Sequence, residues 1–400
     1  MSGMLVQRPR LYTMKSCSFL GSTWSASGRI RGLPLHLIRL FSMPRPIVAT
    51  TDLAAMRANL ALARAAAPGA KIWAVVKADA YGHGLENGLS AFAQADGLSL
   101  IEFDRAVRLR ELGWQRPIMM MQGMFDSSDL SIIGDHGLQP VIHTSEQLDM
   151  LDHFQPKRPV DVHLKINTGM NRLGFPSSQA RAVWQRLSAM PAVGKVSLIT
   201  HFANADQSSA DPDVAEQMRR FHEATTGLRA EVSVSNSPAI LLHPDIRCDW
   251  IRPGVMLYGG SPGGGSAQSF GLKAAMSLTT RLIAVQSLKA GDSVGYGSLF
   301  RAERDMRIGI VACGYADGYP RHAPTGTPVL VNGKRSQLLG RVSMDMLNVD
   351  LSSISDAQVG SEVMLWGADL PVDEVAQAAG TIGYELMCSI TPRVQRATTP

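Results

Sequence analysis

The sequence has few of the features that mark a membrane-spanning, disulfide-bonded or metal-binding protein. It contains no uninterrupted apolar run approaching the roughly 18 residues that a membrane-spanning helix needs. Its four cysteines (Cys17, Cys248, Cys313 and Cys388) are widely separated and include no CxxC pair. Neither a disulfide framework nor a zinc site is therefore indicated. Reduced thiols are the simplest interpretation, and they predict a cytoplasmic location.

Acidic residues are absent from the first 42 positions, which carry six cationic side chains. The rest of the chain therefore has a net charge of −1, although the whole chain carries +5. A near-neutral body does not favour a nucleic-acid surface. The leader resembles a transit peptide in being basic and serine-rich, while His36 and Arg39 interrupt its best candidate for a signal peptide. We predict that residues 1–42 form a disordered or non-native leader, with Met43 as the natural start.

A regular rhythm of short apolar strand, turn and helix begins near residue 50. A first helix is expected after a cap at Thr51 or Asp52 and is stopped by Pro68-Gly69. Eight strand–helix units follow, which predicts a (β/α)8 barrel over residues 43–273. The predicted strands are 71–77, 98–101, 117–121, 138–143, 160–166, 196–202, 231–235 and 249–252.

The pattern of apolar residues changes near residue 275, where alternation of apolar and polar residues replaces helical periodicity. Asn332-Gly333 between two alternating runs is typical of a type I′ hairpin. One helix, VDEVAQAAG, is expected near the end. These patterns predict a mainly antiparallel β domain over residues 274–400. The preceding segment GSPGGGSAQS, 260–269, has the composition of a flexible linker or loop.

Reactive and hydrogen-bonding side chains recur at the predicted carboxyl ends of the barrel strands, where barrel enzymes carry out their chemistry. Each has a structural alternative when it is taken alone, such as a solvated lysine, a core histidine or an Arg252–Asp249 ion pair. Together they favour a ligand site. The residues are Lys77 at the end of strand one, Lys165 at the end of strand five with Arg172 in the segment that follows, His201 at the end of strand six, Ser235-Asn236-Ser237 after strand seven, and Arg252 at the end of strand eight, before Pro253-Gly254.

The clusters after strands seven and eight occupy the usual phosphate site of such barrels, because hydroxyls and glycine N–H groups bind phosphate. A phosphate site opposite an imine-forming lysine predicts pyridoxal 5′-phosphate. Arg252 would then lie against the pyridine ring. Because arginine only donates hydrogen bonds, the ring nitrogen would stay unprotonated. That weakens the cofactor as an electron sink and favours reprotonation of the substrate, and hence racemisation, over transamination.

The chain resembles the fold-type III pyridoxal-phosphate alanine racemases from about Pro44 to Arg396. The resemblance implies an isomerase that interconverts L- and D-alanine by a two-base mechanism on a pyridoxal-phosphate aldimine. It also implies a homodimer with shared active sites, and D-alanine that is either made for peptidoglycan or catabolised. The segments that carry the resemblance are VVKADAYGHG, LKINTGMNRLGF, HFANAD, SNSPA, RPGVMLYG, VGYG, GYADGYPR, GRVSMDM and IGYELMCSITPRV.

The resemblance also implies a role for individual residues. Lys77 looks like the Schiff-base lysine and one base, and Tyr296 like the opposite base, supplied by the partner subunit. Both side chains ordinarily titrate near pH 10, so we expect neighbouring cations such as Arg172 and Arg252 to lower their pKa values. The remaining implied roles are cofactor binding by Tyr81, His201, Asn236, Ser237, Arg252, Gly254, Val255 and Tyr384; substrate binding by Arg172 and Met344; carbamylation of Lys165 to N6-carboxylysine; and lining of the entrance by Tyr315, Arg321 and Arg341.

Two other interpretations are open. A broader-specificity racemase of the same family differs only in substrate range, and a periplasmic one would need a clearer signal peptide. A non-catalytic pyridoxal-phosphate carrier is a different class, but such proteins are essentially the barrel alone, whereas this chain adds a domain containing Tyr296. Small departures from the family pattern, such as Asn167 where many members have Asp, affect no proton-transfer residue.

Overall fold

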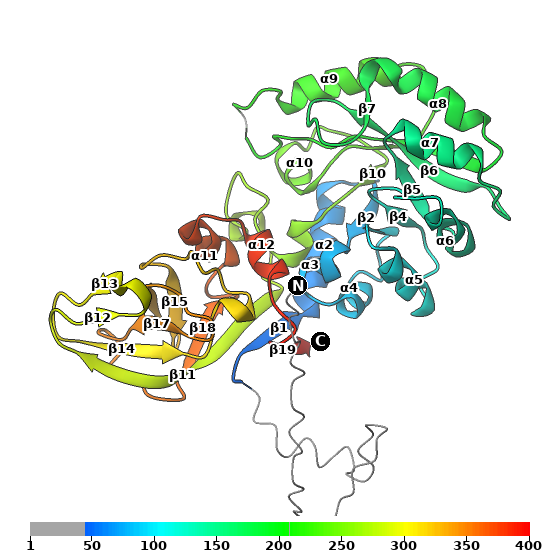
Figure 1. Ribbon diagram of the computed structural model, residues 1–400. Helices are drawn as coiled ribbons and strands as arrows, with labels where there is room; N and C mark the ends of the chain where they lie inside the picture. Colours follow the sequence, from blue (N-terminus) through cyan, green and yellow to red (C-terminus); the bar gives the residue numbers. More distant parts are fainter. Residues whose placement is uncertain (1–44, 208) are drawn as a thin grey trace, which may run out of the picture. The chain divides into compact units, whose positions relative to one another are not determined.

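The computed structural model describes residues 45–207 and 209–400, so the predicted leader, residues 1–42, lies outside the described residues. Eight parallel strands form a barrel (Figure 1). An isolated parallel bridge between Asn236 and Arg252 closes the ring between the last two barrel strands in the sequence. This arrangement confirms the predicted (β/α)8 barrel. In order around the ring the strands are β10 (Trp250–Ile251), β2 (Lys71–Val75), β3 (Gly97–Leu100), β4 (Ile118–Met120), β5 (Gln139–Ile142), β6 (Val160–Asn167), β8 (Val193–Ile199) and β9 (Val232–Ser233).

Helices between the strands bury one apolar face each. In the first of them the Asp52 carboxylate accepts a hydrogen bond from the Ala55 N–H at 2.8 Å, and Met56 and Leu60 are buried. Of the two predicted caps, Asp52 is therefore the one used. The helices are α2 (Leu53–Ala66), α4 (Leu85–Ala91), α5 (Phe103–Glu111), α6 (Asp129–His136), α7 (Ser145–Asp152), α8 (Ala180–Ala189), α9 (Val214–Thr225) and α10 (Ser237–Leu242), and a short strand β7 (Phe175–Pro176) pairs with β6.

A separate apolar cluster takes one side chain from each of five barrel strands: Trp73, Met119, Val141, Ile199 and Trp250. The Trp73 and Trp250 rings stack with centroids 4.3 Å apart. Gly97 on the neighbouring strand makes room for this pair, because a Cβ there would lie 2.2 Å from the Trp73 ring. The Trp73 ring can therefore occupy this position only because the paired residue, Gly97, has no side chain.

We predict that Gly97→Ala destabilises the protein by about 1–3 kcal/mol, the usual cost of overpacking a core. Thermal or denaturant unfolding would measure the loss. The double variant Gly97→Ala/Trp73→Phe should lose less than the sum of the two single changes, because the smaller ring relieves the collision. Strict additivity would contradict this account of the interior.

A second sheet, mainly antiparallel, follows the barrel in sequence. The predicted hairpin is confirmed, since Asn332 and Gly333 have φ of 48° and 73° and join two paired strands. The sheet order is β14 (Met306–Val311), β17 (Leu347–Asp350), β16 (Lys334–Leu339), β15 (Pro328–Val331), β18 (Glu362–Trp366), β11 (Met276–Leu288), β1 (Val48–Asp52) and β19 (Gln395–Thr399); a separate ribbon comprises β12 (Ser293–Val294) and β13 (Phe300–Arg301), and the helices are α11 (Val372–Ala379) and α12 (Gly383–Cys388).

The structure differs from the sequence-based division at the first strand. Residues 48–52, which were assigned with the barrel, pair antiparallel with the start of β11 and parallel with β19. The adjoining Arg45 donates to the Asp317 carboxylate at 3.1 Å. A five-residue strand that pairs with partners more than two hundred positions away carries no local signal of its sheet. Within the described residues, no helix is both long and apolar enough to cross a membrane.

Candidate active site

A cavity of about 890 Å³ lies at the carboxyl ends of the barrel strands and is closed on one side by the α11–α12 region. The segment 260–269, predicted as a linker or loop, contributes Ser261, Pro262 and Gly263 to its wall. Many residues singled out from the sequence meet in this one cavity. They are Lys77, Tyr81, Lys165, Arg172, His201, Asn236, Ser237, Arg252, Gly254, Val255 and Tyr384.

Lys77 reaches the cavity from an unusual turn. Strand β2 ends at Val75, two residues earlier than predicted, and Lys77 begins the short helix α3 (Lys77–Tyr81). The four residues 78–81 have φ between 52° and 54°, in the left-handed region. This conformation costs roughly 1–2 kcal/mol per residue for L-amino acids, so the surroundings must hold it.

Three contacts hold the left-handed turn. The Ala78 N–H donates to the Glu102 carboxylate at 2.9 Å, and the Asp79 carboxylate accepts from the Leu85 N–H at 3.0 Å. Gly82 ends the turn against α12, where a Cβ would lie 2.1 Å from the Met387 carbonyl oxygen. The glycine after Tyr81 is thus required by a close approach of the α12 backbone.

Burial is the largest cause that lowers the pKa of Lys77, and the positive charge of Arg172 is the second. Cys388 and Glu102 act in the opposite direction. The sequence suggested neighbouring cations as the cause; the structure adds desolvation as the larger one. A lowered pKa favours the neutral amine, which is the nucleophilic and basic form.

Arg252 is 3% exposed and makes no ion pair among the described residues. Its two terminal nitrogens donate to the carbonyl oxygens of Ser233 at 2.7 Å and Thr200 at 2.6 Å. Asp249, the alternative partner considered from the sequence, accepts instead from the Val232 N–H at 2.7 Å. Burial lowers the pKa of Arg252 to about 10.

The remaining donor of Arg252, its Nε–H, is buried and has no hydrogen-bond partner within the part of the chain that the structure describes. A buried donor without an acceptor costs about 1–3 kcal/mol. Because Arg252 lines the cavity, a ligand with a hydrogen-bond acceptor at this place would remove that cost. The unprotonated nitrogen of a pyridine ring is such an acceptor, so this part of the site fits pyridoxal phosphate.

Hydroxyls and backbone N–H groups gather on the Ser237 side of the cavity. The Gly254 N–H donates to the Ser237 hydroxyl at 2.9 Å, and a Cβ on Gly254 would lie 2.7 Å from the Tyr81 hydroxyl oxygen. Tyr384 lies beside Tyr81, with ring centroids 6.1 Å apart. Burial raises the pKa of both tyrosines, so both stay protonated and able to donate. This cradle suits a phosphate group.

The floor of the cavity carries more positive than negative charge. Burial and then the charges of Arg252, Arg172 and Lys77 lower the pKa of Lys165 to about 8. Burial, the largest cause, and then the charges of Arg252, Lys165, Arg172 and Lys77 hold the pKa of His201 well below its usual value, so its imidazole is neutral. Such a cavity favours an anionic cofactor and a substrate with a carboxylate.

Apart from Tyr384, the β-domain residues that were implied by the resemblance do not line this cavity. Tyr296 is 71% exposed and Met344 51% exposed. The Tyr315 and Ala316 N–H groups donate to the carbonyl oxygens of Ser343 and Met344, so these segments lie side by side. Arg341 is near Tyr296, since its guanidinium lies 3.8 Å from a Cβ built on Gly297. Arg321 is exposed on the same domain.

Sequence reasoning missed several wall residues. Asp206 and Cys388 lie inside segments that were quoted for the resemblance, HFANAD and IGYELMCSITPRV, so a signal for them was present. Asp373 has no such signal. It reaches the wall because α11 packs against the loop at Ser261, whose N–H donates to the Asp373 carboxylate at 2.8 Å.

The fold and the cavity together define a class: a barrel enzyme with a lysine of lowered pKa, an anion-binding cradle and a buried arginine that has no anionic partner in the described part of the chain. Family models describe the chain as the N-terminal domain of alanine racemase over residues 51–262 and the C-terminal domain over residues 275–398. An alanine racemase of Janthinobacterium sp. (strain Marseille) is 59% identical over 358 residues, with 88% of this chain and 99% of that protein covered.

Solved structures that resemble this chain are also alanine racemases. The biosynthetic alanine racemase of Pseudomonas aeruginosa superposes with a TM-score of 0.87 at 46% identity, covering 89% of this chain and 100% of that one. The alanine racemase of Bartonella henselae, solved with covalently bound pyridoxal phosphate, has a TM-score of 0.81 at 25% identity, with 89% and 100% covered. The chain belongs to the alanine racemase family, whose members are pyridoxal-phosphate-dependent racemases.

Proposed function

We propose that this chain interconverts L- and D-alanine, with pyridoxal 5′-phosphate bound in the cavity around Lys77. The observation that carries the proposal is that one cavity contains both a lysine with a lowered pKa and a buried arginine whose Nε–H has no hydrogen-bond partner among residues 45–207 and 209–400. Relatives that are more than half identical over nearly their whole length and are named alanine racemases support it.

The cofactor, when bound, attaches to an amine and stabilises negative charge at the α-carbon of the substrate. Lys77 would hold it covalently, and the Arg252 Nε–H would donate to its ring nitrogen. Arg252 is itself kept in place by backbone carbonyls, with the His201 Nδ1 a further 3.3 Å neighbour. The phosphate would be held by Tyr81, Ser237, Tyr384 and the backbone at Gly254 and Val255, with Asn236 capping the helix that presents Ser237.

Lys77 would then act as the base on one face of the substrate. A lowered pKa increases the share of its neutral amine, which is the form that can accept a proton. Arg172 lines the same cavity and is the cation that we assign to the substrate carboxylate. Holding the carboxylate fixes the direction of the Cα–H bond relative to Lys77.

The direct test is a racemase assay on the full chain and on Lys77→Ala. The wild-type protein should show the visible absorbance of lysine-bound cofactor and should racemise alanine faster than serine, arginine or lysine. Lys77→Ala should lose both that absorbance and nearly all activity, because the anchor and one base disappear together. Absorbance that survives the substitution would mean that another lysine binds the cofactor.

For the second base we propose Tyr296 of a second copy of the chain. Tyr296, Leu299, Met344 and Met346 are 71%, 62%, 51% and 44% exposed, which is unusual for large apolar side chains in a free domain. A two-fold axis that places this face over the barrel mouth of the partner would create two identical sites. Met344 would then offer its N–H to the substrate carboxylate, and Tyr315, Arg321 and Arg341 would line the entrance.

Mixed dimers test the shared site. Lys77→Ala and Tyr296→Phe are each expected to be inactive, and co-expression in equal amounts should make half of the dimers mixed. One site in every mixed dimer then has both native residues. About one quarter of wild-type activity should return if assembly is random. Mixed dimers that are confirmed by mass spectrometry and yet have no activity would rule out a site built from two chains.

Lys165 is the residue that we propose to be carbamylated. Its neutral amine would attack carbon dioxide, forming a carbamate anion and releasing one proton. A pKa of about 8 makes the neutral form available near physiological pH, and the surrounding Arg252, Arg172 and Lys77 charges favour an anion in its place. The carbamate would also give Arg172 an anionic partner.

Carbon-13 NMR with labelled bicarbonate can test this modification. Because the pKa of Lys165 is lowered to about 8, the signal should grow as pH rises through 8 at a fixed concentration of dissolved carbon dioxide. Lys165→Gln should remove the signal. A signal of unchanged size in that variant would assign the carbamate to a different amine.

The cytoplasmic location stays a prediction from the cysteine pattern.

A further inference from the structure

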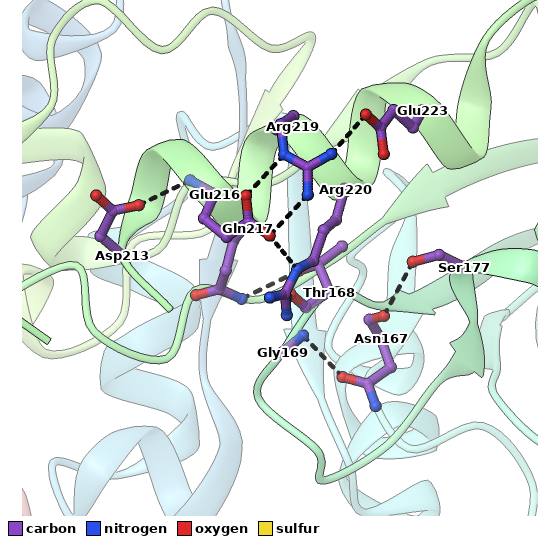
Figure 2. A network of polar contacts seen from close by, with 10 residues as sticks. All are labelled: Asn167, Thr168, Gly169, Ser177, Asp213, Glu216, Gln217, Arg219, Arg220 and Glu223. Carbon is purple, nitrogen blue, oxygen red and sulfur yellow. Dashed lines mark hydrogen bonds and ion pairs between the residues drawn. The ribbon is translucent and has the colours of Figure 1, made fainter. Parts of the chain in front are cut away.

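Gln217 on α9 is fully buried and uses its carboxamide to join two loops of the barrel mouth. Its Oε1 accepts from the Ala203 N–H at 2.8 Å. Its Nε2 donates to the Thr168 hydroxyl at 3.0 Å and to the His201 carbonyl oxygen at 3.3 Å. Figure 2 shows Gln217 pointing from the helix toward Thr168. A buried glutamine with three contacts on two separate loops links them more directly than apolar packing does.

The contacts continue as a one-way chain of hydrogen bonds. The Thr200 hydroxyl donates its only proton to the Ile166 carbonyl oxygen at 2.8 Å. The 2.9 Å contact between the two threonine hydroxyls must therefore be a donation from Thr168 to Thr200. Thr168 is left as the acceptor for Gln217. Each group therefore donates to the next in the order Gln217, Thr168, Thr200 and the Ile166 carbonyl oxygen of β6.

This chain lies directly behind residues that we assign to the active site. Thr168 stands between Lys165 and Arg172 on the loop after β6. The carbonyl oxygen of Thr200 accepts from the Arg252 guanidinium at 2.6 Å. Gln217 also binds the backbone at His201. Three strand ends are thus held in register by one buried side chain and two threonines.

The loop that leads to Arg172 is held from two further directions. The Asn167 carboxamide accepts from the N–H groups of Gly169 and Asn171 at 3.0 and 3.1 Å, which closes a tight turn. Arg220 donates to the Thr168 carbonyl oxygen at 3.3 Å and is itself paired with Glu216 (Figure 2). Thr168 is therefore bound through both its backbone and its hydroxyl, four residues before Arg172.

We propose that Gln217 is a positioning residue for substrate binding: through Thr168 and Thr200 it holds the loop that carries Arg172 in register with the strand ends that carry His201 and Arg252. The proposal rests on the proposed racemase function, because it assigns Arg172 to the carboxylate of alanine. Gln217 itself does not line the cavity. Its effect should appear in the affinity for carboxylates more than in the binding of the cofactor.

Gln217→Met tests this role, because methionine keeps the length and apolar volume of the side chain but neither donates nor accepts a strong hydrogen bond. The probe is propanoate, which has the methyl and carboxylate groups of alanine without its amine. Calorimetry on the cofactor-loaded protein should show propanoate binding weakened about tenfold, and kcat/KM should fall by about 10- to 100-fold, mostly through KM. The visible absorbance of the cofactor should not change.

Asn59→Leu is the matched control. Asn59 is also fully buried, and its carboxamide makes three hydrogen bonds, to Leu257 and Lys273, away from the Arg172 loop. Both variants should lose comparable thermal stability, but the control should bind propanoate within about twofold of wild type. If Gln217→Met is equally destabilised and also keeps its propanoate affinity and KM, Gln217 is a structural residue only.

Thr168 supplies a second route if Gln217→Met does not fold. Thr168→Ser keeps the hydroxyl and should retain wild-type affinity, whereas Thr168→Val should weaken propanoate binding as Gln217→Met does. Equal affinities for the two variants would overturn the proposal. A wild-type protein that does not racemise alanine would overturn the proposed function instead, whatever these variants bind.

Discussion

The site depends on one constraint: the guanidinium of Arg252 is buried in the barrel mouth and has no carboxylate partner among the described residues. Isolated buried charges are costly, and proteins usually pair them. Here Arg252 is satisfied by backbone carbonyls from two neighbouring strands, and one donor is left over. That choice leaves the cavity cationic. The lowered pKa values of Lys165 and His201 both have Arg252 as their second cause, after burial.

The strained turn at Lys77 also depends on a small number of specific contacts. Four consecutive residues in the left-handed region would not persist in isolation. They persist because Glu102 accepts from the Ala78 N–H, because Asp79 within the turn accepts from the Leu85 N–H, and because α12 lies directly against Gly82. The turn brings Lys77 and Tyr81 into one cavity within five residues. The strained turn thus places Lys77 for the proposed covalent attachment and Tyr81 for the proposed phosphate contact.

A division of labour follows between the two sheets. The barrel supplies every residue that we assign to cofactor binding except Tyr384 of α12, while the β domain presents Tyr296 to solvent. The buried chain through Gln217 lies on the barrel side, behind the loop of Arg172. In our proposal the barrel therefore determines how the substrate carboxylate is held, and the second copy of the chain completes the proton transfer.

The sequence by itself determined the barrel, the hairpin at Asn332-Gly333 and the family, because strand–helix rhythm, turn chemistry and short motifs are local patterns. It also identified Lys77, Ser237 and Arg252 as members of one site, since parallel strands of a barrel end on the same face. Only the tertiary structure decided that residues 48–52 join the second sheet, that burial outweighs Arg172 in lowering the pKa of Lys77, and that Gln217 reaches Thr168. These three depend on contacts between residues far apart in the chain and on exclusion of water, and neither leaves a periodic trace in the sequence.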